Sequence, residues 1–355
     1  MSKHHREHNW APALASLNED ELSNKDLELS QSVVSQSAVS QSAVSQSDSW
    51  LNLIKSGVSI ADDHTHMLSV VNFVHELNLQ LAQKGRDLIY QPTADDLVVK
   101  AKASGVSHML EVGCEYPDWE PTISFAKSHS DCVRAAIAIH PNEAVLHGHR
   151  GTTGPDGLPV VYKPYHDIPF DEAMQHLRSL IISNPEEIVA IGETGLDYFR
   201  TGEPSRFAQR EAFRDHISLA KELNMPLQIH DREAHSDVIE ILLKDGAPEM
   251  TVFHSYSGDA CIAAILRENG WFASFSGTIG YKGNEDLRES ARIIGLNHIT
   301  VETDAPYLTP MPYRGRPNAP YMVPYTLETL SQVLDISLSK AAKVTRENTE
   351  KIYGF

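Results

Sequence analysis

Eight short apolar runs recur between residues 58 and 304, and stretches with the spacing of amphipathic helices separate most of them. Short apolar runs bounded by polar turns are typical of strands that are buried on both faces of a parallel sheet. Strands that alternate with helices predict an α/β fold, and eight such units predict a closed (β/α)8 TIM barrel. A doubly wound open sheet is the alternative, but no Gly-x-Gly-x-x-Gly motif follows the first run. The expected strands cover residues 58–64, 106–113, 133–140, 187–193, 226–230, 250–254, 271–277 and 298–304.

The first 57 residues differ in composition from the rest of the chain. They repeat a five-residue unit close to Ser-Gln-Ser-Ala-Val, which offers too little apolar surface to offset the entropy lost on ordering. We therefore expect a disordered, Ser/Gln-rich tail at 1–57 and a single barrel domain at 58–355. A Pro/Gly-rich connection at 141–169 is also unusually long, and long connections are typically functional or mobile. The clearest expected helices cover 93–104, 118–129, 171–183, 205–223, 233–245, 284–294, 324–335 and 339–352.

Composition excludes several classes of protein. The formal net charge is −18, so the field of the whole molecule repels polyanions, and any contact with nucleic acid must be local. Cys114, Cys132 and Cys261 lie far apart and form no Cys-x-x-Cys pair, which argues against a disulfide framework or a thiolate zinc site. No run approaches the roughly 20 apolar residues that span a bilayer. We expect a cytoplasmic protein that does not bind membranes.

Chemically active side chains occur at the carboxyl ends of six of the expected strands. In a parallel barrel these ends converge on one face, where enzymes of this fold place their active sites. A single histidine at a strand end is usually a hydrogen-bonded structural residue, but coincidence across six strands favours a common site. The residues are His64, His66, His140, Glu193, His230, His254 and Asp304.

The residue types at these ends predict a metal centre. Because strand side chains alternate between faces, His64 and His66 point to the same side and can bind one ion. Imidazoles and carboxylates suit divalent ions such as zinc and manganese, and a carboxylate can bridge two ions about 3.5–4 Å apart. We expect two divalent metal ions (Mg²⁺, Mn²⁺ or Zn²⁺), one on His64, His66 and Asp304 and the other on His230 and His254, with Glu193 as the bridge.

Two acidic positions have further expected roles. Asp304 is a candidate to accept the proton of a metal-bound water, so that Asp304 and Glu193 are the catalytic candidates, although Asp304 could instead cap a helix before "APYL". Strand alternation also predicts that Asp62 faces into the barrel with His64, whereas Asp63 faces the other way.

Five ordered motifs carry a resemblance to a known family. The stretches "DDHTHM", "IGETGLDYFR", "IHDREAH", "VFHSYSG" and "ETDAPYLTPMPYRGRPNAPYMVP" resemble the signatures of the TatD family of metal-dependent deoxyribonucleases, from about residue 60 to 355. The resemblance implies an amidohydrolase-like TIM barrel, the six metal ligands named above, and hydrolysis of DNA phosphodiester bonds, in several members as a 3′ to 5′ exonuclease. The expected substrate is DNA at single-stranded ends. Two departures are Ala138, where the family usually has Gly in a Gly-x-His-Pro motif, and the long 141–169 connection.

Candidate substrate contacts lie beside these ligands. Arg232 could pair bidentately with a phosphate, or it could form a structural ion pair with Glu193 or Asp231. His140 could bind a phosphate oxygen or protonate a leaving group. The remaining candidates are Arg314 and Arg316, which could bind phosphate from the last loop, and Tyr198 and Phe199, which could stack on a base or pack in the core.

Two other functions compete with the nuclease. An amidohydrolase acting on a small amide, lactone or phosphoester would use the same barrel and the same His-x-His start. Many such enzymes bridge their metals with a carbamylated lysine on the fourth strand, but no lysine lies between residues 164 and 220, which favours the nuclease. A degenerate barrel that serves as a binding protein is disfavoured because all six candidate ligands are intact.

Overall fold

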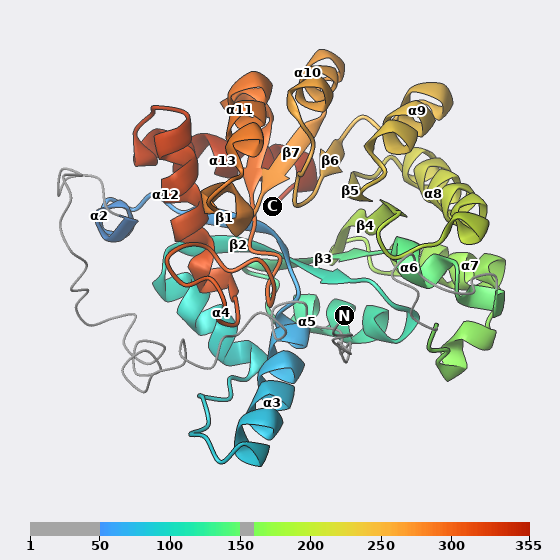
Figure 1. Cartoon of the computed structure of the whole chain (residues 1–355), viewed down its shortest axis with the longest axis horizontal. Helices are drawn as coiled ribbons and strands as arrows, with labels where there is room; N and C mark the ends of the chain where they lie inside the picture. Colours follow the sequence, from blue (N-terminus) through green and yellow to red (C-terminus); the bar gives the residue numbers. More distant parts are fainter. Residues whose placement is uncertain (1–49, 150–159) are drawn as a thin grey trace, which may run out of the picture.

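The computed structural model describes residues 50–149 and 160–355. Eight parallel strands pair in chain order from β1 to β8, and helices surround them (Figure 1). The predicted TIM barrel is confirmed, and each strand lies at one of the eight apolar runs. The strands are β1 (Ile60–Thr65), β2 (Val106–Gly113), β3 (Val133–Ile137), β4 (Ile188–Asp197), β5 (Leu227–Arg232), β6 (Thr251–Phe253), β7 (Phe272–Phe275) and β8 (Ile299–Val301).

The helices of the described segments include all eight that the sequence predicts, together with α2, α3, α6 and α10. The buried residues of α3 are three or four positions apart, so its apolar face has the usual helical spacing. The α-helices are α2 (Trp50–Lys55), α3 (Met67–Gln83), α4 (Ala94–Ala103), α5 (Trp119–Ser128), α6 (Pro141–Ala144), α7 (Phe170–Ser183), α8 (Glu203–Leu223), α9 (His235–Asp245), α10 (Ala260–Asn269), α11 (Glu285–Ile294), α12 (Val323–Val333) and α13 (Leu338–Tyr353).

The first and last strands meet through a buried carboxylate. Asp62 on β1 accepts hydrogen bonds from the Thr303 backbone N–H at 2.8 Å and from the Thr303 hydroxyl at 2.7 Å. Two backbone bonds continue this contact, from Asp304 N–H to the His64 carbonyl and from His66 N–H to the Ala305 carbonyl. These contacts join the two ends of the sheet.

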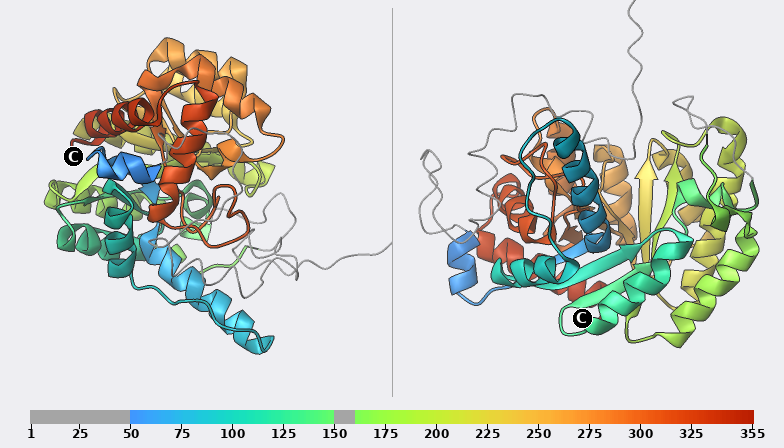
Figure 2. Two further views of the ribbon diagram at one scale, coloured as in Figure 1. Left: turned by 90° about the vertical axis from the view of Figure 1, so that its left-hand side faces the viewer. Right: turned by 90° about the horizontal axis from the view of Figure 1, so that it is seen from below.

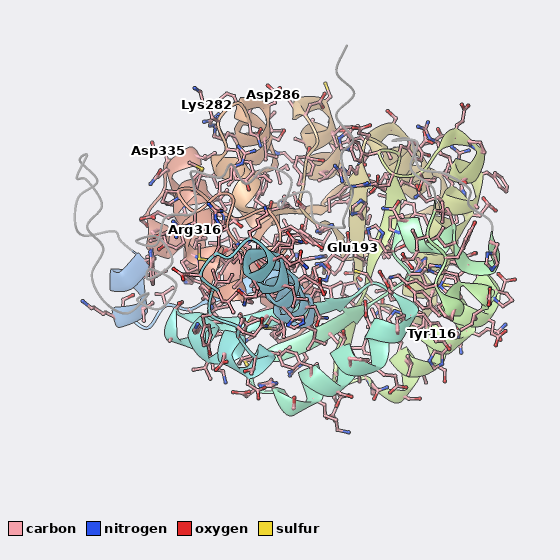
Figure 3. The ribbon with its side chains drawn as sticks, turned by 60° about the horizontal axis from the view of Figure 1, so that its bottom comes forward. Tyr116, Glu193, Lys282, Asp286, Arg316 and Asp335 are labelled. Carbon is pink, nitrogen blue, oxygen red and sulfur yellow. The ribbon has the colours of Figure 1, made fainter. Side chains whose placement is uncertain are left out.

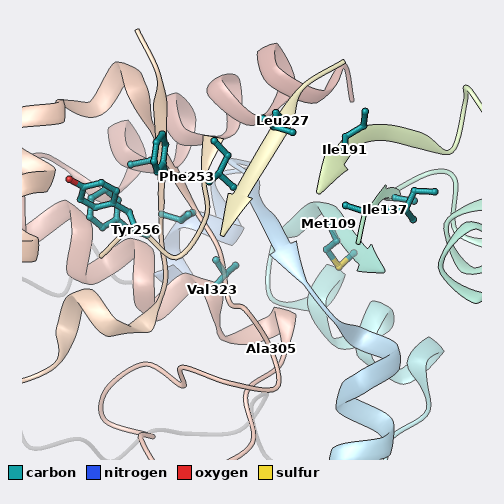
Figure 4. Packing of buried hydrophobic residues seen from close by; sticks show 14 of the residues in the cluster. Met109, Ile137, Ile191, Leu227, Phe253, Tyr256, Ala305 and Val323 are labelled. Atoms are coloured by element: carbon teal, nitrogen blue, oxygen red, sulfur yellow. The ribbon is translucent and has the colours of Figure 1, made fainter. Parts of the chain in front are cut away.

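Two apolar layers hold the barrel together. One lies between the sheet and the helices and includes Met109, Ile137, Ile191 and Leu227 (Figure 4). The other fills the barrel interior with residues from alternate positions of the same strands, such as Leu110 beside Met109. The interior layer ends at Tyr353, Ile352 and Phe355 from the end of the chain, so the C-terminal helix α13 closes one end of the barrel.

The two irregular segments predicted from the sequence are described only in part. Of the expected tail, residues 1–49 lie outside the described segments, whereas α2 packs on the barrel: Leu53 is buried, and the ring of Trp50 lies 5.8 Å from that of Tyr325. Of the 141–169 connection, the described residues run to 149 and resume at 160. His166 Nε2 lies 2.7 Å from Glu143 Oε2, which ties the second part to α6.

Within the described residues, no helix is long and apolar enough to cross a membrane. The helices instead present one buried face to the sheet and an exposed face to solvent. Two further views of the ribbon show this outer ring of helices (Figure 2).

His216 on α8 gives the fold a specific pH dependence. It is fully buried; its Nδ1–H donates to the Ala212 carbonyl, and its Nε2 accepts the Ile139 N–H at 3.2 Å. Burial lowers the pKa of His216 to about 4. The unfolded chain therefore binds a proton at this residue between about pH 6.5 and pH 4, where the folded chain does not, so the free energy of unfolding falls as the pH falls through that window.

We predict that His216→Gln weakens this pH dependence, because glutamine carries no titrating charge. Between pH 7 and pH 4.5, the decrease in the free energy of unfolding, measured by denaturant titration, should be smaller than in the wild type by about 2 kcal/mol. The exposed His75 on α3 provides the matched control, His75→Gln, which should behave as the wild type. Equal decreases in all three proteins would contradict the prediction.

Candidate metal centre

The seven polar side chains predicted at the strand ends meet on one face of the barrel. Glu193 lies near the middle of the molecule, whereas Lys282, Asp286 and Asp335 lie at its edge (Figure 3). His64 is fully buried, and the side chains of the other six are 5% to 18% exposed. Each of the seven has a side-chain nitrogen or oxygen within 4 Å of such an atom in another member of the set.

One oxygen of Glu193 faces the first group of ligand atoms. Its Oε2 lies 3.5 Å from His64 Nε2 and 3.9 Å from His66 Nε2. Asp304 Oδ1 lies 3.7 Å and 3.5 Å from the same two nitrogens, which are 3.1 Å apart. Ligands about 2.0–2.2 Å from a tetrahedral zinc ion are about 3.3–3.6 Å from one another, and the separations among His64, His66 and Asp304 are close to this range, as ligands of one ion would need.

The other oxygen of Glu193 faces a second group. Its Oε1 lies 2.5 Å from His230 Nδ1, 2.9 Å from His254 Nε2 and 3.4 Å from His140 Nε2. His230 and His254 approach each other to 3.5 Å. The carboxylate thus lies between two groups of candidate ligands, one at each oxygen, which is the arrangement that a bridging ligand requires.

The hydrogen bonds of the histidines determine which ring nitrogen faces the centre. The amide nitrogen of Gln228 donates to the Asp63 carbonyl and the Tyr353 hydroxyl, so its Oε1 accepts from His64 Nδ1 at 2.7 Å. His66 Nδ1 donates to the Val112 carbonyl at 2.9 Å. Both Nε2 atoms therefore point to the centre, and at 3.1 Å from each other they need a proton or a cation between them.

His140 has the opposite arrangement. Its Nδ1 accepts the backbone N–H of Asn142 at 3.1 Å, so the hydrogen of the neutral ring is on Nε2, toward Glu193. A ring in this form donates a hydrogen bond and does not offer a lone pair to an ion. The sequence-based assignment of His140 to the substrate is compatible with this geometry.

The charges in the centre are strongly coupled. Burial raises the pKa of Glu193, but His254, His140 and His230 outweigh that effect and hold the pKa well below its usual range. Burial lowers the pKa of His66, but Asp304 and Glu193 raise it to about 9. Burial and the neighbouring His254 lower the pKa of His64. Protons thus compensate the buried carboxylates, and a divalent cation can replace them.

Two glycines near Glu193 allow β4 to lie close to β5. A Cβ on Gly192 would come within 2.6 Å of the Gln228 side chain, and one on Gly195 would come within 2.1 Å of the His230 carbonyl oxygen. Gly195 also has a φ of +142°, which side-chain-bearing residues rarely adopt. The glycines on either side of Glu193 therefore let β4 lie close to β5, and the pairing of the two strands shifts between Ile191 and Thr194.

The predicted orientation of the two aspartates before His64 is wrong. Asp63, not Asp62, faces the interior: its Oδ1 accepts from Ser274 at 2.6 Å, and burial together with the Glu302 charge raises the pKa of Asp63 to about 8. Asp62 instead contacts Thr303. The pairing of β1 with β2 shifts between Asp62 and Thr65, and such an irregularity breaks the alternation on which the prediction rested.

Four further residues of the centre are absent from the sequence-based set. Asp197 Oδ2 lies 3.2 Å from His230 Nε2, and Glu302 Oε1 lies 3.4 Å from His254 Nδ1. Gln228 orients His64, and Cys114 Sγ lies 3.3 Å from Glu193 Oε2. Asp197 and Glu302 are within the quoted motifs "IGETGLDYFR" and "ETDAPYL", and Cys114 directly follows β2, so their positions at strand ends were available as a signal.

Comparison with known proteins agrees with this architecture. The sequence profile of a family described as "TatD related DNase" matches residues 61–354. The chain belongs to the TatD family. It is 35% identical over 268 residues to the uncharacterized metal-dependent hydrolase TatD of Mycobacterium tuberculosis (strain ATCC 25618 / H37Rv), which covers 74% of this chain and 91% of that protein.

A second TatD-family relative is the uncharacterized metal-dependent hydrolase YcfH of Escherichia coli (strain K12). It is 37% identical over 260 residues, 73% of this chain and 88% of that protein. The crystal structure of YJJV, a TatD homolog from Escherichia coli k12, has a TM-score of 0.65 and 21% identity, and covers 83% of this chain and 98% of that one. The similarity to this crystal structure shows the shared fold. Membership of the family makes this chain a metal-dependent hydrolase.

The three arginines that the sequence suggests as phosphate contacts in this TatD-family chain each lie on an aromatic ring. The guanidinium carbon of Arg232 is 3.9 Å from the centre of the Phe199 ring, and among the described residues Arg232 forms no ion pair. The ion pair of Arg232 with Glu193 or Asp231 that the sequence left open is therefore not formed. The other two pairs are Arg314 over Tyr281 at 4.4 Å and Arg316 over Tyr313 at 5.6 Å.

We predict that Gln228→Met weakens binding of divalent ions by about 10- to 100-fold, because a ring no longer held at Nδ1 loses its fixed orientation. Competition of the purified protein with a chromogenic chelator for Zn²⁺ measures this change. The control is Tyr353→Phe, which removes an acceptor of the Gln228 amide but leaves the bond to His64. Unchanged zinc affinity in Gln228→Met would contradict the assigned role.

Proposed function

We propose that this TatD-family hydrolase cleaves DNA phosphodiester bonds, acting on single-stranded ends as a 3′ to 5′ exonuclease. The observation that supports the proposal most directly is the position of Glu193, with one carboxylate oxygen toward each of two ligand groups. Pairs of divalent ions bridged in this way suit in-line displacement at phosphorus, which needs both the attacking and the leaving oxygen stabilised.

The ligand sets follow the two groups. In this proposal His64, His66 and Asp304 would hold the first ion, His230 and His254 would hold the second, and Glu193 would be a ligand of both. When bound, Mg²⁺, Mn²⁺ or Zn²⁺ would supply a water that is acidic enough to give hydroxide near neutral pH and positive charge for the leaving oxygen. The two Nε2 atoms of His64 and His66, which face each other at 3.1 Å, fit such a cation.

Asp304 is assigned as the proton acceptor of the attacking water. Its side chain is 14% exposed, against 7% for Glu193, so it is the more accessible of the two carboxylates. It lies at the edge of the first group, whereas Glu193 is enclosed between the groups. In the reaction, the water oxygen bonds to phosphorus, its proton passes to Asp304, and the bond from phosphorus to the leaving oxygen breaks.

The substrate contacts are assigned to His140 and Arg232. His140 has its ring hydrogen on Nε2 and can donate it to a phosphate oxygen or to the leaving oxygen. Arg232 has an exposed guanidinium that is stacked on Phe199 and keeps its N–H donors available for a phosphate. The arginine–aromatic pairs also suit unpaired bases, which stack on such surfaces.

The test is a side-by-side assay of single-stranded DNA, duplex DNA, RNA and a panel of lactones and amides with defined metals. We predict release of mononucleotides from single-stranded DNA, loss of activity with EDTA, and a decrease in kcat of at least about 10²-fold in Asp304→Asn. The control variant is Asp335→Asn, which lies at the edge of the molecule (Figure 3). Hydrolysis of a lactone or amide that depends on Asp304, with DNA left intact, would replace the nuclease by a small-molecule amidohydrolase.

We predict that Arg232→Ala raises KM for single-stranded DNA by about tenfold and leaves kcat nearly unchanged, because a lost phosphate contact weakens binding of substrate and transition state alike. The matched control is Arg292→Ala on the outer helix α11, where the arginine pairs with Glu289. Steady-state kinetics on a labelled oligonucleotide measures both. A KM that does not change in Arg232→Ala would exclude Arg232 from substrate binding.

A further inference from the structure

The end of β2 contributes a side chain to the centre that is neither histidine nor carboxylate. Cys114 directly follows β2 (Val106–Gly113), which is the position that the candidate ligands occupy on the other strands. Its carbonyl accepts the His140 N–H at 3.0 Å, so the backbone of Cys114 is held against the end of β3. The thiol is thus fixed at the same face of the barrel as the ligand groups.

The sulfur lies on the first-group side of Glu193. Its distance to Glu193 Oε2 is 3.3 Å, and Oε2 is the oxygen that faces His64 and His66. The ligand atoms of His66, Cys114 and Glu193 all lie within 4.8 Å of one another, as ligands of one ion must. The same limit holds for His64, His66 and Asp304, so the two groups share His66, and the cysteine adds a sulfur donor beside the first group through His66 and Glu193.

We propose that Cys114 is a metal ligand of this centre and makes it a mixed nitrogen, oxygen and sulfur site. The inference rests on the metal centre of the proposed function. On binding, the Cys114 Sγ–H bond breaks, its proton passes to solvent, and a bond forms between sulfur and the ion, with no change of oxidation state. Thiolate sulfur favours zinc, cobalt and ferrous iron over magnesium, so the first ion is of that class.

The consequence concerns metal choice. A centre made only of imidazoles and carboxylates accepts Mg²⁺, Mn²⁺ or Zn²⁺, whereas a thiolate disfavours Mg²⁺. The other two cysteines are suitable controls, because neither Cys132 nor Cys261 belongs to a metal-capable group of the described residues. Cys132 is buried just before β3, and Cys261 is exposed at the start of α10.

The test is cobalt titration of the metal-free full-length protein, followed by absorption spectroscopy. A thiolate bound to Co²⁺ gives a near-ultraviolet charge-transfer band, which histidine and carboxylate ligands do not give. We predict this band in the wild type and in the Cys132→Ser/Cys261→Ser double variant, and its loss in Cys114→Ser with the visible cobalt bands retained. Those visible bands show that Cys114→Ser is folded at the site and still binds the ion.

A second readout is metal preference. Cys114→Ser should lower the affinity for Zn²⁺ by at least about tenfold and leave the affinity for Mg²⁺ unchanged, as measured by chelator competition and calorimetry. Stoichiometric cobalt without a charge-transfer band in the wild type, or a band that persists in Cys114→Ser, would overturn the assignment of Cys114 while leaving the nuclease proposal intact. A wild-type protein that binds no cobalt would overturn both, and a band without DNA hydrolysis would refute only the DNA substrate.

Discussion

The contact between Asp62 and Thr303 joins residues 241 positions apart in the chain, and the candidate centre depends on it. His64 and His66 belong to the start of the barrel, whereas Asp304 follows its last strand. Only closure of the sheet brings these three together, through the buried Asp62 carboxylate and the backbone bond from Asp304 to His64. The carboxylate accepts both an N–H and a hydroxyl, so it replaces ladder hydrogen bonds where β8 ends and the strands no longer pair regularly.

The sequence predicted the barrel and the residues of its centre because both depend on positions that a sequence displays. Apolar runs show where a strand ends, and the ends of parallel strands converge whatever the details of packing. It could not predict which side of the strand each residue faces, as Asp62 and Asp63 show. Alternation holds along a regular strand, but the pairing of β1 with β2 shifts between Asp62 and Thr65, so Asp63 and His64 both reach the interior. The pairing of β4 with β5 shifts in the same way between Ile191 and Thr194, on either side of Glu193. Irregular pairing arises from close contacts such as those at Gly195, which appear only in three dimensions.

The groups that orient the ligands could not be predicted from the sequence for a related reason. In the sequence Gln228 looks like an ordinary strand residue. Its role depends on hydrogen bonds to His64, Asp63 and Tyr353, of which His64 is 164 positions away and Tyr353 is 125 positions away. Tyr353 comes from the last helix and accepts one hydrogen bond from the Gln228 amide nitrogen, while the Asp63 carbonyl accepts another, which is enough to fix the hydrogen-bonding state of the amide. That state in turn determines which nitrogen of His64 faces the centre. A ligand is therefore defined by its orientation as much as by its residue type.

The net charge of −18 and a polyanionic substrate are compatible only if the local field differs from the average. At physiological ionic strength, charges more than about 8 Å from a phosphate are largely screened. Acidic residues on the outer helices therefore add little electrostatic repulsion at the centre. In the proposed function the substrate would meet Arg232 on its Phe199 ring at the barrel face, together with the cations that Glu193, Asp304 and the histidines would hold. With the two divalent ions of the proposed function in place, Glu193 and Asp304 would not repel the phosphate, because four positive charges would outweigh their two negative charges. Binding should therefore respond to single arginines at the barrel face, and little to charge changes on the outer helices.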